Sequence, residues 1–189
     1  MKKLTHTILP VFLFSFILIL NGCNKTENTK TIVQEIALPE YVVPGSVNNQ
    51  MYTYVAPVKQ SDFQQSFKDA GIPFDASKII NSGFGDLFVK TTKPDGADAN
   101  FDDFDYGDIY FRKDGATSAA DDIKVGHFEY STPGSSECLM KGIDAGNLKE
   151  FIASKDKFYM VISLHRKNSD GNDKKMAAKA TIKLDVSLD

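Results

Sequence analysis

The stretches FYMVISL, residues 158–164, and AKATIKLDVSL, residues 178–188, decide the fold. In both, every even-numbered residue is apolar. Successive side chains of a strand point to opposite faces, so each stretch predicts a β-strand with one buried face and one solvated face. The polar residues 168–173, NSDGND, lie between the two stretches and favour a hairpin loop.

Shorter strand patterns precede these two, and helical patterns are few. Pro39 breaks the apolar run at 32–43, which leaves at best an edge strand, and Pro57 is expected to end the strand that begins at Met51. Further strands are expected at 79–92, 108–113, 123–130 and 137–141, with a type I turn at 94–96. Short helices are expected from Ser61, capped by that serine, to Gly71, and over 147–154. Many alternating strands joined by turns predict a mainly β protein, an antiparallel β-sandwich with one or two short helices.

The N-terminus has the order of a signal peptide. Lys2 and Lys3 precede an apolar run from Ile8 to Leu20. That run is shorter than the roughly 20 residues that a membrane-spanning helix needs, so it is interpreted as the apolar core of a cleaved signal.

The end of this segment, Leu20-Asn21-Gly22-Cys23, resembles the lipobox of bacterial lipoproteins. The resemblance implies cleavage after residue 22 and acyl chains, such as palmitate, on Cys23. It therefore implies an envelope protein held on a membrane, with the outer membrane as the expected one. Two or three acyl chains anchor a soluble domain stably, because each buried CH₂ contributes about 0.8 kcal/mol.

The remaining chain is expected to be a lipidated tether at 23–31 and a single sandwich domain at 32–189, of ordinary domain size. Without residues 1–22 the chain has 20 basic against 25 acidic side chains, a net charge of −5, which argues against nucleic-acid binding. Cys138 is the only other cysteine, so no disulfide framework is expected, and it is interpreted as a small apolar residue packed in a strand.

From about residue 75 onward the order of features is similar to that of Gram-negative envelope lipoproteins of uncharacterised function. The features are the strand 87–92, Pro94 to Gly96, the segment Asn100-Phe101-Asp102-Asp103-Phe104, a strand followed by Asp114-Gly115, a short helix and two long closing strands. The resemblance implies an immunoglobulin-like sandwich and brings no catalytic residues. The extra acid at position 103 departs from the family pattern.

One segment is dense in oxygen ligands. Within 98–108 the carboxylate and amide side chains are Asp98, Asn100, Asp102, Asp103, Asp105 and Asp108. Ca²⁺ takes six to eight oxygen ligands, so this segment is a candidate metal site, although its spacing is not that of an EF-hand loop. The stronger expectation is a solvated acidic loop whose Phe101, Phe104 and Tyr106 cover one end of the sandwich.

No catalytic pattern is present in the sequence. His127, on the strand parity of Val125, and His165 lie in no zinc or nucleophile motif and are interpreted as structural. We therefore expect no enzyme and no cofactor, but a binding or structural module that recognises an envelope protein or glycan. The alternatives are a metal-dependent enzyme, or a Ca²⁺-stabilised glycan-binding module, that uses the acidic loop. Seven tyrosines without any tryptophan are expected mainly in strand packing.

Overall fold

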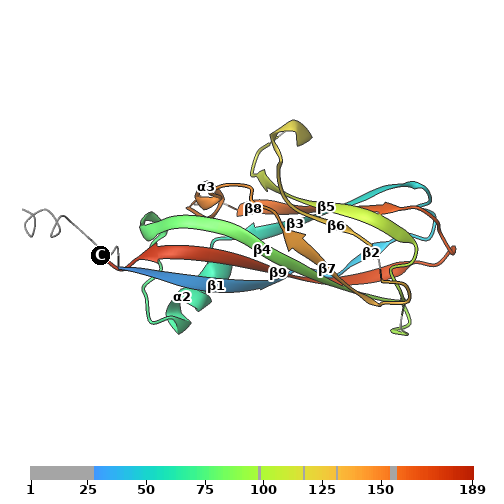
Figure 1. The fold of residues 1–189 in the computed structure, drawn as a ribbon, viewed down its shortest axis with the longest axis horizontal. Coiled ribbons are helices and arrows are strands. Elements are labelled where there is room, and N and C mark those ends of the chain that lie inside the picture. The colour runs from blue at the N-terminus through green and yellow to red at the C-terminus, as the bar shows by residue number, and fades with distance from the viewer. Residues whose placement is uncertain (1–27, 98, 117, 131, 154–156) are drawn as a thin grey trace, which may run out of the picture.

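The computed structural model describes residues 28–97, 99–116, 118–130, 132–153 and 157–189 (Figure 1). The described residues form an antiparallel β-sandwich with two short α-helices, as the alternation predicted. The elements are β1 (Thr29–Ala37), β2 (Tyr41–Val43), β3 (Gln50–Lys59), α2 (Ser61–Asp69), η1 (Ala76–Lys78), β4 (Ile79–Thr92), β5 (Phe104–Lys113), η2 (Ala119–Asp121), β6 (Ile123–Glu129), β7 (Glu137–Gly142), α3 (Lys149–Ala153), β8 (Lys157–Arg166) and β9 (Lys174–Ser187). Neither α-helix is long or apolar enough to cross a membrane.

The strands form one hydrogen-bonded path that folds over on itself into two layers. The order is β1-β9-β4-β7-β6-β5-β8-β3, and β2 also pairs with β9. We call β1, β2, β9, β4 and β7 the first layer and β6, β5, β8 and β3 the second layer (Figure 1). The core lies between them, where the rings of Phe84 in β4 and Phe111 in β5 meet edge to face at 5.8 Å.

Two glycines allow the path to turn from one layer into the other. β6 and β7 pair only through Gly126 with Gly142 and through the next pair of residues. A Cβ at Gly142 would lie 2.2 Å from the carbonyl oxygen of Gly85, which no side chain tolerates. The junction between the layers therefore depends on a backbone contact that only glycine permits.

The opposite side of the sandwich, between the edge strands β1 and β3, is closed by side chains. Tyr41 of β2 stacks on Tyr54 of β3 with ring centroids 4.1 Å apart. Helix α2 contacts both β1 and β3 and buries Phe63 and Phe67 completely, on the one face that their spacing of four predicted. This helix is therefore stabilised by packing rather than by its length of nine residues.

Three local predictions were wrong. Pro57 does not end its strand, because β3 is an edge strand and needs no donor from its outer side. Ser61 is the first residue of α2 and not its cap. The cap is Gln60, whose side chain makes no capping hydrogen bond. Pairing of β1 begins at Thr29 and not at residue 32, so the ordered sheet starts earlier than expected.

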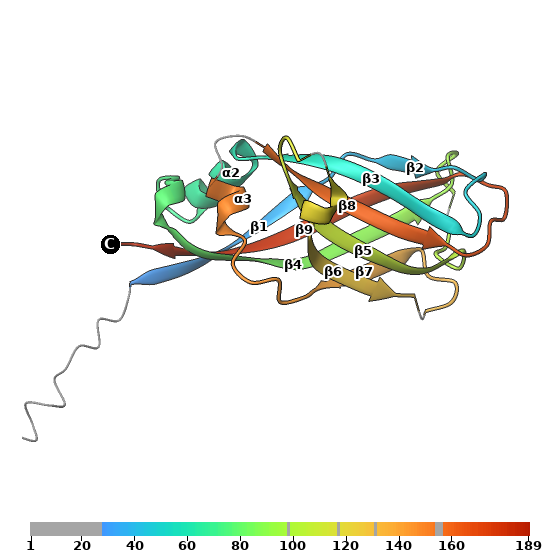
Figure 2. The ribbon, with the colours of Figure 1, turned by 90° about the horizontal axis from the view of Figure 1, so that it is seen from above.

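The prediction of a hairpin between the last two strands was wrong, because β8 and β9 do not pair with each other. β8 pairs with β3 and β5, whereas β9 pairs with β1, β2 and β4. Residues 167–173 therefore cross from the second layer to the first, and we call them the β8–β9 arch. In both views the arch lies at the end of the molecule opposite the beginning of β1 and the C-terminus (Figures 1 and 2).

Candidate functional site

The outer face of the second layer has an unusual concentration of aromatic and histidine side chains. Strand alternation directs these side chains to solvent from four neighbouring strands. We call this surface the tyrosine–histidine face. Its members are Met51, Thr53 and Val55 of β3, Tyr159, Ser163 and His165 of β8, Tyr106, Asp108 and Tyr110 of β5, and Lys124 and His127 of β6.

One row of this face crosses three strands with apolar and aromatic groups. Met51 and Tyr106 both pair with His165, from opposite sides. The His165 ring stacks on the Tyr106 ring at 4.8 Å, and its Nδ1 lies 2.6 Å from Oδ1 of Asp105. A register shift in β5 between Phe104 and Tyr106 places two successive β5 side chains against this ring. The row is therefore rigid, while Met51 and Tyr106 remain 43% and 38% exposed.

The neighbouring row is polar. Thr53 and Ser163 are joined by a 3.1 Å hydrogen bond, and Asp108 is paired with Ser163 on one side and His127 on the other. Nδ1 of His127 and Nζ of Lys124 each lie 2.6 Å from Oδ1 of Asp108.

The charge of Asp108 is held by these partners. Burial alone raises the pKa of its carboxyl group, but hydrogen bonds from Lys124, His127 and Tyr110 outweigh burial and lower it. Burial raises the pKa of Tyr110, and the neighbouring Asp108 raises it further. The row therefore contains a fixed carboxylate between a neutral phenol and basic groups.

The position of His127 differs from the prediction. In β6, Val125 is buried while His127 faces solvent, although both are odd-numbered. The pairing of β5 with β6 slips between Ile109 and Tyr110, whose partners are Gly126 and Lys124, so that one β6 residue is unmatched. This bulge reverses the parity and brings His127 to Asp108.

Within this row the side chains are not ordered as a nucleophile, a base and an orienting acid would be. The carboxylate of Asp108 stands between the positions of Ser163 and His127. A serine nucleophile needs a histidine within hydrogen-bonding distance, and no such contact joins these two residues in the part of the chain that the structure describes. The geometry of these three residues is not that of an acyl-transfer triad.

The acidic segment does not converge on one point. Asp98 lies outside the described residues. The others have separate partners: Asn100 accepts from the amide of Asp102; Asp102 accepts from Tyr130 and the amide of Gly134; Asp103 pairs with Arg166 and Lys174; Asp105 pairs with His165; and Asp108 pairs with His127 and Lys124. Over the described ranges, no three His, Cys, Asp or Glu side chains are grouped as metal ligands would be. Phe101 and Phe104 are fully buried as expected, whereas Tyr106 faces solvent.

A buried ion cluster, which sequence reasoning missed, lies under the β8–β9 arch. Arg166 is completely buried and donates to Oδ2 of Asp103 at 2.6 Å, to Oδ1 of Asp170 at 3.0 Å and to the Pro44 carbonyl at 2.8 Å. Lys174 lies 3.4 Å from the same Asp103 oxygen. Both cations continue the even-numbered inward rows of β8 and β9, so extending the parity would have found them. Every charge in this cluster has a partner, which makes it structural.

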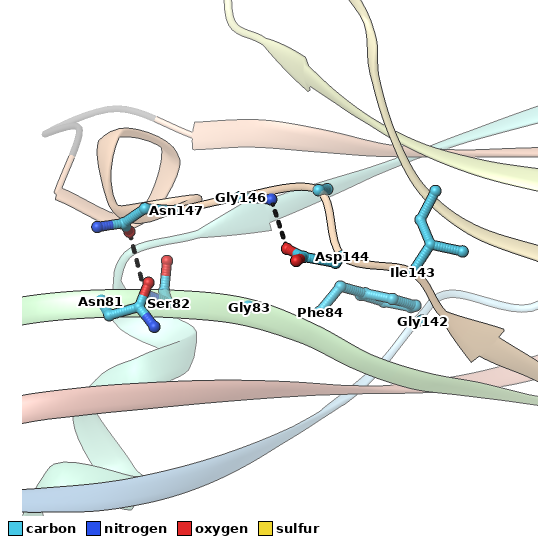
Figure 3. Close-up of a pocket in the computed structure, with 10 residues that line it drawn as sticks. Asn81, Ser82, Gly83, Phe84, Gly142, Ile143, Asp144, Gly146 and Asn147 are labelled. Carbon is cyan, nitrogen blue, oxygen red and sulfur yellow. Dashed lines mark hydrogen bonds between the residues drawn. The ribbon is translucent and has the colours of Figure 1, made fainter.

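A second feature is a groove where β7 leaves β4 (Figure 3). The chain departs at Gly142 and returns at Asn147, whose Oδ1 accepts from the amide of Ser82 at 3.1 Å and whose Nδ2 donates to the Ile80 carbonyl at 3.0 Å. The space between them is open to solvent and has a volume of about 440 Å³. We call it the β4 groove, and it is lined by Asn81, Ser82, Gly83, Phe84, Gly142, Ile143, Asp144, Ala145, Gly146 and Asn147.

Cys138 has the environment that was expected of a packing residue. Its side chain is buried in β7, and this burial raises the pKa of the thiol to about 12. The thiol therefore stays protonated near neutral pH, which makes it a poor nucleophile.

No protein-family model and no curated protein matches the chain. Among solved structures, the crystal structure of FlhE is similar at 4% identity and a TM-score of 0.31, over 85% of this chain and 98% of that one. The decameric BFDV capsid protein is similar at 10% identity and a TM-score of 0.33, over 84% of this chain and 98% of that one. The structure of Desmodium yellow mottle tymovirus is similar at 7% identity and a TM-score of 0.32, over 98% of this chain and 97% of that one.

Proposed function

We propose that this chain is a lipid-anchored protein of the cell envelope that acts without catalysis, as a binding module, through the tyrosine–histidine face. The exposed row of Met51, His165 and Tyr106 is the observation that carries the binding part of the proposal. Exposed aromatic and methionine side chains held rigidly are typical of the centre of recognition surfaces. The partner is an envelope protein or glycan.

The outer face of the first layer provides a contrast. Charged side chains alternate along it, including Lys179, Lys183 and Asp185 of β9, and Glu35 of β1 pairs with Lys179. Phe88 pairs with Leu139 on this face, and the two are 38% and 53% exposed, but Phe88 lacks the stacked histidine that orders Tyr106. The stacking of His165 on Tyr106, rather than a difference in apolar exposure, supports assigning recognition to the second layer.

The lipobox supports the anchor. Cys23 is separated from β1 only by residues 24–28, so an acylated Cys23 holds the beginning of the sheet near a bilayer. Replacing Cys23 by serine is expected to abolish incorporation of radiolabelled palmitate and to release the chain from the membrane fraction. Cys138→Ala is the matched control and should keep the label, because that thiol is buried. Labelling of Cys23→Ser would contradict the anchor.

Photo-crosslinking in intact cells tests the binding face. A photoreactive phenylalanine analogue at Tyr106 or at Met51 is expected to give an adduct of the same size, because both positions belong to one row. The control position is Phe88, which is as exposed as Tyr106, at 38%, but lies on the other layer. Equal adducts from Phe88, or none from the face, would contradict the proposal, as would turnover of a substrate by the purified protein.

A further inference from the structure

The β4 groove leads from solvent to the core-facing side of β4. Ser82 and Phe84 are buried members of that side, 1% and 8% exposed, and both line the groove. The other wall is the segment from Ile143 to Gly146, which stands away from β4 (Figure 3). In Figure 3 the side chains of Ser82 and Asp144 project into the space between the strand and this segment.

Ser82 supplies a polar group that the fold does not use. Its backbone amide and carbonyl are bonded to Asn147 and Leu148, but its Oγ has no hydrogen-bond partner among the described residues. Leaving a buried hydroxyl unpaired costs about 1–3 kcal/mol. A ligand hydroxyl that hydrogen-bonded to this oxygen would recover this energy, because a serine hydroxyl both donates and accepts.

The lining determines the chemistry of such a ligand. Asp144 is the only charged side chain among the ten lining residues, and none is Lys, Arg or His, so an anionic ligand would lack a counter-charge. The Asn147 carboxamide is already bonded to Ser82 and Ile80, so the remaining polar groups are the Asn81 carboxamide, the Ser82 hydroxyl and glycine backbone. Phe84 adds an aromatic ring. A ligand with several hydroxyls and one C–H face satisfies both kinds of group.

We infer that the β4 groove binds a single neutral sugar residue. Its volume of about 440 Å³ lies within the range of small-molecule sites, roughly 300–1,000 Å³. Asp144, whose Oδ1 already accepts from the amide of Gly146, accepts from sugar hydroxyls through Oδ2. Ser82 bonds a further hydroxyl at the bottom of the groove, and Phe84 contacts the C–H face. The groove is separate from the tyrosine–histidine face, so this site goes beyond the proposed function. The outcome of its test is independent of the outcome for that face.

The test is a titration of the full chain in detergent micelles with D-glucose, N-acetyl-D-glucosamine and D-glucuronate, followed by amide chemical shifts. A neutral sugar is expected to shift the amides of Ser82 and Gly146 and to bind more tightly than glucuronate, which Asp144 repels. Ser82→Ala should weaken binding about tenfold, the equivalent of about 1.4 kcal/mol. It should leave the melting temperature unchanged or higher, because it removes an unpaired hydroxyl.

Thr91→Val is the matched control. Thr91 is also a fully buried residue of β4 whose hydroxyl has no partner among the described residues, but it does not line the groove. Its replacement should raise stability and leave the sugar dissociation constant unchanged. The inference is overturned if no neutral sugar shifts the groove amides, if glucuronate binds more tightly, or if Ser82→Ala and Thr91→Val affect binding equally.

Discussion

Arg166 has a full positive charge and no exposed surface. It is accommodated because Asp103, Asp170 and two backbone carbonyls accept its hydrogen bonds, and its guanidinium carbon lies 5.8 Å from the centre of the Phe104 ring. Extending the parity of β8 by two residues beyond Leu164 would have predicted the inward direction of this side chain, which the sequence analysis missed. It could not predict Asp103 as a partner, because 63 positions separate the two residues and no local pattern joins them.

Arg166→Met is expected to lower the free energy of unfolding by about 3–5 kcal/mol, because Asp103 would remain buried with too few donors. Urea denaturation measures this loss. The control is Lys175→Met, which breaks the exposed pair between Lys175 and Glu40 and should cost about 0–1 kcal/mol. If the two variants were equally stable, the cluster would not hold the arch.

Asp108 makes stability depend on pH. Its pKa is lowered in the folded state, despite the burial that raises it, so its contribution is present above the unfolded value of about 3.9 and is lost as the pH falls through the folded value. Asp108→Asn should therefore be less stable than the native chain at pH 7, and the difference should shrink below pH 4. A difference that stayed constant from pH 7 to pH 2 would contradict this assignment.

At the scale of the elements, alternation located strands at the expected positions, and Ile79–Thr92 coincides with β4. It did not predict their partners, because the pattern of one strand determines which face is buried and not which strand lies beside it. The arch shows the consequence. Two closing strands joined by seven residues suit a hairpin equally well, but Arg166 and Lys174 meet the same carboxylate from facing layers.

The candidate site was predictable to a similar extent. The tyrosines and histidines could be placed on strands, but the contact between His165 and Asp105 depends on a register shift in β5. The bulge that turns His127 outward could likewise not be predicted from the pattern of one strand, because it arises from a mismatch between β5 and β6.

The arch packs closely against Gly45, which gives a prediction at this scale. A Cβ at Gly45 would lie 2.3 Å from the carbonyl oxygen of Gly171, so Gly45→Ala should destabilise the protein by about 1–3 kcal/mol. Thermal unfolding measures the effect. Gly83→Ala is the control: its Cβ meets no atom within 4 Å, and alanine in a strand should stabilise by about 0.5–1 kcal/mol. Two similar melting temperatures would rule out the close contact.

At the scale of the whole molecule, the proposed anchor determines an orientation. Residues 24–28 reach at most roughly 20 Å, so the end with Thr29 and Ser187 stays near the bilayer. Fourteen residues of β9 extend roughly 45 Å towards the arch. The row of Met51, His165 and Tyr106 lies in the half of the molecule near the arch, because it pairs the beginnings of β3 and β5 with the end of β8.

Fluorescence quenching by nitroxide lipids tests this orientation. A dye attached through Ser187→Cys is expected to be quenched strongly in vesicles, whereas a dye attached through Lys167→Cys in the arch should be quenched little. The native Cys138 should not compete for the dye, because its thiol is buried and its pKa is raised to about 12. Equal quenching at both positions would contradict an upright domain.

The pairing of β1 with β9 joins the first strand of the sheet to the last. In a polypeptide exported from its N-terminus, the earliest strand to emerge must wait for the final one, and β4 also lacks its main neighbour until then. If the chain is exported as proposed, closure of the first layer waits until translocation is nearly complete, and an interrupted export event would leave apolar strands unprotected. Such late closure, with contacts distant in sequence, predicts slow folding and a need for chaperones during transit.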